Sequence, residues 1–340
     1  MGDVDELPFA LATSVGPVPA PTARGAAEFA LSTQPQLPTA PTLAKHGATL
    51  LAQALDGLHG VRAAPPGLVA LDGETLGFDP GGVARLGGEA FEPLQTMLGL
   101  ARTSDELLGV RIPLLGPVTV ALSLRSAGVA TEAAVDVAAQ LVTVRAAALL
   151  DTARAAVPDA VVMMVLNEPG LIGAMHPTFP LGPAEVRALL DPVVDGLDRR
   201  NGRGRLLIGA HVPGRTDWGA IISSGVSLIS TPADGGMLGW AEVLADFLER
   251  GGRVAWGAVP VDQPLGTGEE LLWRRLTATW CELVGEGVDP LLLRTRSFIG
   301  PADGLAHFGV TQAERVLGLV DSLSVRARRQ AVGARLTLGA

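Results

Sequence analysis

The sequence predicts an α/β fold, a (β/α)8 TIM barrel, because short apolar runs alternate along it with longer helical patterns. Eight runs have the length and apolar character of strands, and most are followed by a segment with apolar residues at helical spacing. Such strands are typical of a parallel sheet that is buried on both faces. No Gly-x-Gly-x-x-Gly turn follows the first run, which favours a barrel over an open doubly wound sheet.

The expected strands and helices follow from these runs in chain order. After the first strand, the proline-rich segment 17–43 is too rigid for a long helix, although Arg24 to Leu31 can form a short one, and we expect it to pack on the barrel. The expected strands are residues 7–16, 67–73, 109–124, 159–170, 205–212, 225–231, 252–260 and 291–300. The expected helices are residues 42–58, 87–100, 131–157, 182–200, 239–251, 268–287 and 311–336.

Length and composition set the broad class of the protein. The 340 residues are enough for one large core, and we expect a single barrel domain over residues 1–340. The net charge of −9 argues against nucleic acid or an anionic membrane as a partner. The single cysteine, Cys281, excludes an intramolecular disulfide and a cysteine-cluster zinc site.

The amino-terminal stretch MGDVDELPFALATSVG opens acidic and lacks a basic stretch leading into an apolar one, so it does not have the pattern of a signal peptide. No apolar run approaches the roughly 20 residues that span a bilayer. We therefore expect a soluble, cytoplasmic protein, a monomer or a homodimer, whose partner is a small molecule and neither nucleic acid nor a membrane.

A histidine ends one of the central strands, in the stretch RLLIGAHVPG at residues 205–214. The apolar run reaches His211 and stops at Pro213. In a (β/α)8 barrel, the carboxyl ends of the strands and the loops that follow them carry the active site. His211 therefore shares a rim with residues from the other strand ends: Gly16, Pro17, Thr119, Asn167, Glu168, Asp234 and Asp303.

Two further candidates are charged residues on apolar strands. Glu168 ends a fully apolar strand, where a buried carboxylate is costly unless it is paired or has a function. We therefore expect it to bind substrate or move a proton, or to be held by a neighbouring arginine. Arg294 and Arg296 alternate along the last expected strand and share a face. If that face points inward, they form a cationic floor for a carboxylate or phosphate; if the strand starts later, Arg294 is solvated.

Five strand-end segments occur in an order that resembles a known family. The family's opening Thr-x-Ile/Val-Gly-Ser-x-Pro segment corresponds to ATSVGPVPAPTARGA, and its Gly-Pro-x-Thr strand to GPVTVAL. Its Asp-Glu-Pro-Ala-Leu segment corresponds to VLNEPGL, its His-x-Cys zinc strand to GAHVPG, and its Pro-x-Cys-Gly-Leu segment to IGPADGLA. From residue 7 to about 310, the chain thus resembles the catalytic barrel of cobalamin-independent methionine synthase, within the uroporphyrinogen-decarboxylase-like superfamily.

The resemblance implies an S-methyltransferase in which zinc ionises the thiol of the methyl acceptor. In the family, the zinc ligands are the His and Cys of the His-x-Cys strand, a carboxylate on the following strand, and the Cys before Gly-Leu. Here His211 is retained, Pro213 and Asp303 stand at the two Cys positions, and Asp234 is the candidate carboxylate. A metal site of His211, Asp303 and Asp234 would be oxygen-rich, so zinc is one candidate cofactor beside manganese and iron.

The remaining assignments leave three functions open. His211 is otherwise a barrel-mouth histidine bonded to Asn167 or a backbone carbonyl, or a residue that transfers protons. The resemblance places an amino-acid substrate at the positions of Pro17 and Asn167, although the family's serine and acidic residue are replaced there. The open functions are a methionine-synthase-like methyltransferase with an altered or lost zinc site, a metal-free decarboxylase- or lyase-like enzyme, and a non-catalytic ligand-binding relative. The candidate catalytic residues are His211, Glu168 and Asp303, and the candidate substrate-binding residues are Gly16, Pro17, Thr119, Asn167 and Arg296.

Overall fold

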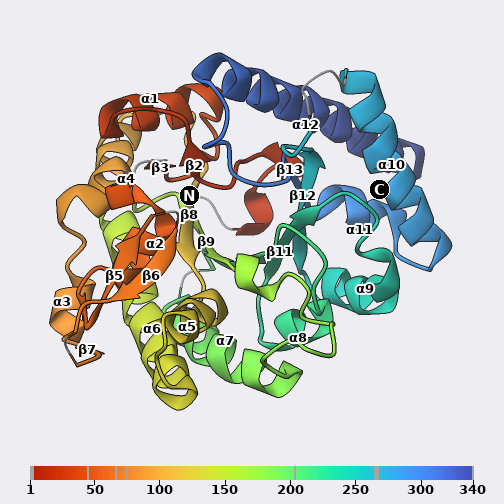
Figure 1. The fold of residues 1–340 in the computed structure, drawn as a ribbon. Coiled ribbons are helices and arrows are strands. Elements are labelled where there is room, and N and C mark those ends of the chain that lie inside the picture. The colour runs from red at the N-terminus through yellow and green to blue at the C-terminus, as the bar shows by residue number, and fades with distance from the viewer. Residues whose placement is uncertain are drawn as a thin grey trace.

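A computed structural model describes residues 4–43, 46–65, 67–73, 75–202, 204–263 and 268–338 of the chain. Its centre is a curled sheet of seven parallel strands with helices around it (Figure 1). Across the sheet the strands follow the order β1, β13, β12, β11, β10, β9, β8. Their bounds are β1 (Leu11–Ala12), β8 (Gly109–Leu115), β9 (Val161–Asn167), β10 (Leu206–His211), β11 (Leu228–Pro232), β12 (Arg253–Val259) and β13 (Ser297–Pro301).

Residues 36–43 lie between β8, at one edge of this sheet, and β2 (Pro17–Val18), which follows β1 at the other edge. Thr39 bridges Arg111 of β8 in parallel, with backbone hydrogen bonds of 2.7 and 2.9 Å on either side of the bridge. Towards the other edge, β3 (Thr42–Leu43) pairs in parallel with β2 (Pro17–Val18), which continues the path of β1. The fold is therefore TIM-barrel-like, with residues 36–43 in the eighth strand position.

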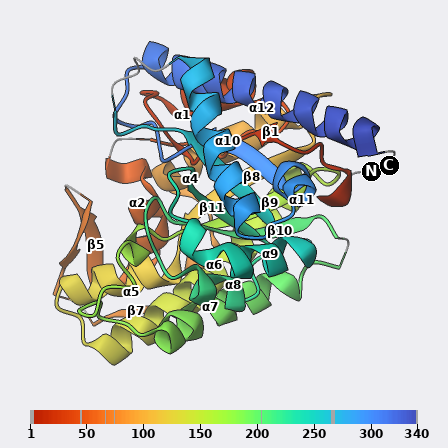
Figure 2. The same ribbon diagram turned by 90° about the vertical axis from the view of Figure 1, so that its right-hand side faces the viewer.

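The prediction of a barrel strand at residues 67–73 is wrong. This stretch forms β6 (Leu68–Leu71), which pairs with β5 (Val61–Ala64) as an antiparallel hairpin separate from the main sheet. Figure 2 shows the hairpin projecting from one side of the molecule. Because Leu68 and Leu71 are more than half exposed, the apolar run that suggested a buried strand serves a surface element instead.

The segment 17–43 belongs to the barrel wall and is not only packed on it. Its strand portion, residues 36–43, carries prolines at positions 38 and 41 and follows Pro35, and prolines have no N–H to donate to a ladder. A run with that many prolines does not have the sequence pattern of a strand, which explains why its place in the ring was not predicted. The short helix expected from Arg24 to Leu31 is confirmed as α1 (Ala23–Thr33).

Helices form the outer layer (Figures 1 and 2). Those expected at 87–100, 131–157, 182–200, 239–251, 268–287 and 311–336 are confirmed. The helix expected at 42–58 is wrong over most of its length, because only α2 (Leu50–Leu55) and a 3-10 turn form there.

The remaining helices are α3 (Pro80–Ala84), α4 (Gly88–Ala101), α5 (Pro117–Ser126), α6 (Thr131–Ala156), α7 (Pro183–Asp198), α8 (Trp218–Ser223), α9 (Ala241–Glu249), α10 (Glu269–Gly285), α11 (Pro290–Thr295) and α12 (Val310–Leu338). The 3-10 helices are η1 (Val4–Glu6), η2 (His46–Ala48), η3 (Pro169–Leu171) and η4 (Leu238–Trp240), and the strands β4 (Leu58–His59) and β7 (Gly77–Phe78) form a pair.

Three expected strands are much shorter than predicted: the run 7–16 contains only the two residues of β1, and a helix forms inside each of the other two runs. The run 109–124 contains β8 followed by α5, which starts with the N-cap Gly116 and a proline in its first turn. The run 291–300 contains the end of α11, which an aspartate caps and a proline begins, followed by β13. These boundaries move Thr119 and Arg296 off the barrel strands.

The apolar core has two parts that are separated by the sheet. One lies between the sheet and the helices, and the other fills the barrel with side chains that alternate along the strands. On β9, Val161 and Val165 point inward, and the same two-residue period turns Asn167 inward. On β10 and β11 it turns His211 and Ser230 inward. Polar side chains therefore line the carboxyl end of an otherwise apolar interior.

Helix α6 is long and apolar enough to cross a membrane by length and composition alone. In the structure it packs against α5, α7 and the strands β8 and β9, as part of the outer layer. A core helix of a soluble protein passes the same test, so this single helix is weak evidence for a membrane span.

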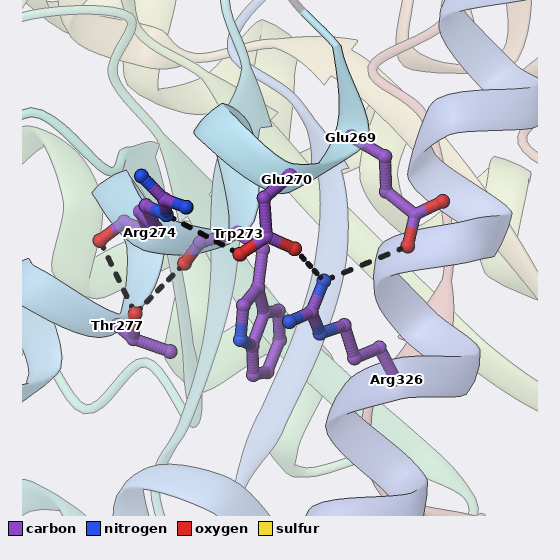
Figure 3. A network of polar contacts seen from close by, with 6 residues as sticks. All are labelled: Glu269, Glu270, Trp273, Arg274, Thr277 and Arg326. Atoms are coloured by element: carbon purple, nitrogen blue, oxygen red, sulfur yellow. Dashed lines mark hydrogen bonds and ion pairs between the residues drawn. The ribbon is translucent and has the colours of Figure 1, made fainter.

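Arg326 fastens α12 to α10 (Figure 3). Its guanidinium carbon lies 4.9 Å from the centre of the Trp273 ring. Its Nη1 is 2.7 Å from Oε2 of Glu270 and 3.9 Å from Oε1 of Glu269. A cation over an indole face is attracted by the ring electrons, and the two carboxylates hold it in place. These contacts join the last two long helices of the barrel.

Arg326→Ala is expected to lower the melting temperature, because it removes a ring contact worth about 1 kcal/mol as well as the ion pairs. Glu269→Gln is the matched control, since it removes only the longer ion pair and is expected to change the melting temperature much less. Thermal unfolding followed by circular dichroism measures both variants. Equal melting temperatures for Arg326→Ala and the wild type would show that the contact does not stabilise the fold.

Candidate functional site

His211 is the last residue of β10, and its side chain is only 2% exposed. Its register partners are Asn167 on β9 and Ser230 on β11. Its Nδ1 lies 2.9 Å from Oγ of Ser230, and its Nε2 lies 3.7 Å from Oδ1 of Asp303, in the loop after β13. The strand ends thus bring His211 and Asp303 face to face, as expected from the sequence.

Arg111 reaches the same cluster from inside the barrel. It is the third residue of β8, it is 1% exposed, and its Nη2 lies 3.4 Å from Oγ of Ser230. Four side chains therefore run from the interior to the rim in the order Arg111, Ser230, His211, Asp303. We call this series the polar column. Its outer end is Asp303, whose side chain is 52% exposed.

The guanidinium sets the direction of the hydrogen bonds in the polar column. Arg111 has only donors, so its N–H donates to Oγ of Ser230. The Ser230 hydroxyl can then donate to Nδ1 of His211, and the ionised Asp303 carboxylate, which only accepts, favours the imidazole proton on Nε2. His211 therefore presents an N–H towards Asp303 and the rim.

Burial and neighbouring charges keep the imidazole neutral and the carboxyl group ionised. Burial lowers the pKa of His211, as does the Arg111 charge, against the opposing effect of Asp303. Partial burial acts to raise the pKa of Asp303, but the His211 imidazole and the N–H of Gly304 hold it below its usual value. Burial lowers the pKa of Arg111 to about 9, which leaves it charged at neutral pH. The polar column therefore has a cation at its inner end and an anion at its outer end.

Three buried polar atoms on the strands β8, β9 and β10 have no hydrogen-bond partner among the described residues. They are Oδ1 of Asn167, Nε2 of His211 and Nε of Arg111. Buried polar groups in proteins are nearly always paired, and an unpaired one indicates a water, an ion or a ligand. Asn167 and His211 are the last residues of β9 and β10, so their unpaired atoms mark the carboxyl end of the barrel as the candidate ligand site, with Arg111 deeper in the interior.

Glu168 does not join the polar column, which corrects its expected role in catalysis. Its fully buried carboxylate accepts hydrogen bonds from N of Val118 at 2.9 Å, from N of Thr119 at 2.7 Å and from Oγ1 of Thr119 at 2.5 Å. A Cβ at Gly116 would overlap this carboxylate, so glycine is required there. Glu168 thus caps the positive end of α5. Thr119 is engaged in the same cap and not in the substrate contact that we expected.

Gly16 and Pro17 lie at the seam of the barrel. Gly16 has a φ of +127°, and a Cβ there would lie 2.8 Å from Cγ of Pro113, so glycine meets both a conformational and a steric need. The carbonyl of Pro17 accepts a hydrogen bond from N of Leu305 at 2.8 Å, beside the loop of Asp303. Pro17 therefore borders the candidate site, whereas Gly16 has a structural role in place of its expected contact with substrate.

Arg296 lies at the opposite end of the barrel, so its expected contact with substrate at the rim is wrong. It follows α11 and precedes β13, and its Nη1 donates to Oδ1 of Asp5 at 3.0 Å. Arg294, in the last turn of α11, donates to the backbone of its own helix. The two arginines therefore do not form a cationic floor inside the barrel.

The metal site expected from His211, Asp303 and Asp234 is not formed. Asp234 is exposed and accepts a hydrogen bond from N of Gly236 in its own turn. Within the described part of the chain, no group of three or more His, Cys, Asp or Glu residues is arranged to hold a metal ion. The residue beside His211 on β11 is Ser230, whose neutral hydroxyl is a poor ligand for zinc. The residues present therefore do not fit the zinc of the methionine-synthase type.

Two members of the polar column, Arg111 and Ser230, are absent from the residues predicted from the sequence. Arg111 stands in the otherwise apolar run GVRIPLL, and a charge on a strand buried on both faces needs a partner. A lone charge in an apolar strand is therefore a sequence pattern that could have identified Arg111 as a candidate. Ser230, in the run GVSLIST, carries none, because a serine is compatible with many strand positions.

Two clefts of about 470 and 550 Å³ lie at the amino end of the barrel, opposite the polar column. Leu7 and Leu108 line the first, and Val4 and Leu206 line the second. In (β/α)8 barrels, residues at this end contribute to stability, and catalytic groups lie at the carboxyl end. We therefore place the candidate site at the polar column and not in the clefts.

The sequence matches no protein-family model and no curated protein. Among solved structures, an agarase, AgWH50C, is 8% identical with a TM-score of 0.35 over 76% of this chain, and the chain spans only 41% of the agarase. The Ignisphaera aggregans GH53 catalytic domain is 12% identical with a TM-score of 0.39, over 88% of this chain and 87% of that one. PbGH5A, a glycoside hydrolase family 5 enzyme from Prevotella bryantii B14, is 10% identical with a TM-score of 0.31, over 82% of this chain and 98% of that one. At these identities and TM-scores the likeness is distant, and the strand pairing of this chain alone establishes its fold.

Glu168→Gln is expected to flatten the pH dependence of stability. Burial raises the pKa of Glu168 to about 7, against the hydrogen bonds from Thr119 and Val118 that act to lower it. Because the folded-state pKa exceeds the unfolded value near 4.5, the favourable contribution is complete below pH 4.5 and is lost as the pH rises through 7. The loss is about 3 kcal/mol in the free energy of unfolding. Urea unfolding of the wild type and the variant at acidic and alkaline pH measures it.

The matched control for this measurement is Glu185→Gln. Glu185 is an exposed carboxylate that also accepts a backbone hydrogen bond at the start of a helix, from N of Gly182 at 2.7 Å. This variant is expected to keep the pH dependence of the wild type. A wild-type pH dependence in Glu168→Gln would contradict the assignment.

Proposed function

We propose that this chain is a metal-independent barrel enzyme that transfers a proton to or from a small molecule at the carboxyl end of its strands. The proposal is carried by the contact between His211 and Asp303, whose Nε2 and Oδ1 lie 3.7 Å apart. Nε2 has no hydrogen-bond partner among the described residues. A neutral imidazole beside an ionised carboxylate can divide the roles of acid and base between two groups.

Each side chain of the polar column has a role in this proposal. Asp303 is half exposed and takes the proton from the substrate. His211 directs its Nε2–H to the same space, where it stabilises negative charge that develops on a substrate oxygen. Ser230 and Arg111 are positioning residues, because they hold the imidazole in the tautomer that carries this proton. Such a site suits a lyase- or decarboxylase-like reaction.

A methyltransferase-type function, like that of cobalamin-independent methionine synthase, is the second candidate. Segments that resemble this family contact one another at one end of the barrel. Residues 116–119 hold Glu168, Pro17 contacts the loop of Asp303, and Asp303 faces His211. These contacts support a fold of the methionine-synthase and uroporphyrinogen-decarboxylase type. Because the residues do not fit zinc, methyl transfer here would use an acceptor that needs no zinc-bound thiolate.

We also propose that the protein is cytoplasmic and acts on a small molecule as a monomer or a homodimer. The net charge of −9 supports the proposal that neither nucleic acid nor an anionic membrane is a partner. The packing of α6 within the outer layer supports a soluble domain.

Proton transfer is tested by incubating EDTA-treated protein in D2O with a panel of 2-oxo acids, 3-oxo acids and α-amino acids. Deuterium incorporation at carbon is followed by NMR. We expect exchange in at least one of these classes, and we expect His211→Gln and Asp303→Asn each to slow it about 100-fold or more. Asp234→Asn is the matched control, since Asp234 is an exposed carboxylate away from the polar column, and it is expected to keep the wild-type rate.

The alternatives give different results in the same experiments. Activity that requires added zinc, or near-stoichiometric zinc in the purified protein that His211→Ala removes, would contradict the proposal and favour the methyltransferase. Binding of panel compounds without exchange or turnover would indicate a non-catalytic relative.

A further inference from the structure

Arg111 is a buried cation that the proposed proton transfer uses only to orient Ser230. We propose that it also binds a carboxylate group of the ligand, at the base of the site beneath His211 and Asp303. This inference deepens the proposed function and rests on it only for the position of the ligand at the carboxyl end of the barrel.

Most N–H donors of the Arg111 guanidinium have no hydrogen-bond acceptor among the described residues. It has five N–H donors, and in the described part of the chain its side chain makes one hydrogen bond, of 3.4 Å, to Ser230. Its Nε is buried and has no partner there. The Nε–H and a terminal N–H of a guanidinium form a fork that binds both oxygens of a carboxylate.

Arg145 and Arg253 also have a buried Nε without a hydrogen-bond partner among the described residues, but each of these guanidinium groups has a carboxylate partner, which Arg111 lacks. Arg253 is 4% exposed, and its Nη2 lies 3.0 Å from Oδ1 of Asp5. The buried Arg145 has its Nη2 4.0 Å from Oδ2 of Asp56. A charge in an apolar interior is costly without a counter-ion, so the unpaired guanidinium points to an anion that the ligand supplies.

The surroundings of Arg111 favour a carboxylate over a phosphate. The buried polar side chains next to Arg111 are neutral: Thr39, its bridge partner in residues 36–43, and Ser230 on β11, to which it donates a hydrogen bond. One positive charge with neutral hydrogen-bonding groups around it balances a single negative charge. A phosphate dianion would leave one negative charge without a counter-ion in the interior.

The test is the effect of acetate on the stability of the full chain at constant ionic strength. Sodium acetate replaces sodium chloride stepwise, and the melting temperature is measured for the wild type, Arg111→Met and the matched control Arg253→Met. We expect a saturable rise of about 2 to 4 °C in the wild type and in Arg253→Met, and no rise in Arg111→Met. In chloride alone, Arg111→Met is expected to melt no lower than the wild type, because methionine fills the space without a charge.

The proposal is overturned if acetate leaves the wild type unchanged, or raises the melting temperatures of the wild type and Arg111→Met equally. A larger effect of sodium phosphate than of acetate overturns the assignment to a carboxylate. If Arg111→Met does not fold, side-chain ¹⁵N NMR of the wild type decides. Acetate must then shift the Nε resonance of Arg111 and leave that of Arg253 in place.

The carboxylate site and the proton transfer can fail separately. His211→Gln removes the proposed proton transfer and is expected to keep the response to acetate. A response that depends on Arg111, in a protein that catalyses no exchange, would support the carboxylate site and reject the proposed function. Exchange in a protein whose stability does not respond to acetate would reject the carboxylate site and support the proposed function.

Discussion

The pairing of residues 36–43 with β8 and with β2 is the constraint on which the candidate site depends. It links β8 to β2 and so completes the ring of parallel strands. The ring sets Arg111 on β8 and Ser230 on β11 at hydrogen-bond distance across the interior, although they are 119 residues apart in the chain. The chemistry at the rim is therefore a consequence of closure by a segment that contributes no ionisable group to the polar column.

Within the closed ring, the polar column places one charged group in the apolar interior and another at the rim. Arg111 and Asp303 have opposite charges and lie at its two ends, with a hydroxyl and a neutral imidazole between them. Glu168 has a different role at the same end of the barrel. Its hydrogen bonds to the first turn of α5 hold the turn that follows β8 in place.

Much of this arrangement could be predicted from the sequence, and the exceptions have physical causes. The alternation of apolar runs and helical patterns predicts a TIM-like barrel, and strand-end positions predict that His211 and Asp303 meet. Residues 36–43 lack the apolar pattern of a strand because of their prolines, so their place in the barrel was not predicted. Residues 67–73 have that pattern, although they form a surface hairpin. Arg296 is misplaced because capping residues, and not apolar periodicity, decide where α11 ends and β13 starts. The partner of His211 depends on strand register, which a single sequence does not reveal for Ser230.

The prolines of the closing segment have a consequence for the open form of the chain. A ring that has not yet closed exposes strand edges, whose unpaired backbone groups can recruit a strand from another molecule. At positions 38 and 41 the segment 36–43 has no N–H to offer, so it is a poor template for such recruitment. The prolines that remove hydrogen bonds from the seam of the folded barrel are thus also expected to reduce aggregation of the incompletely folded chain.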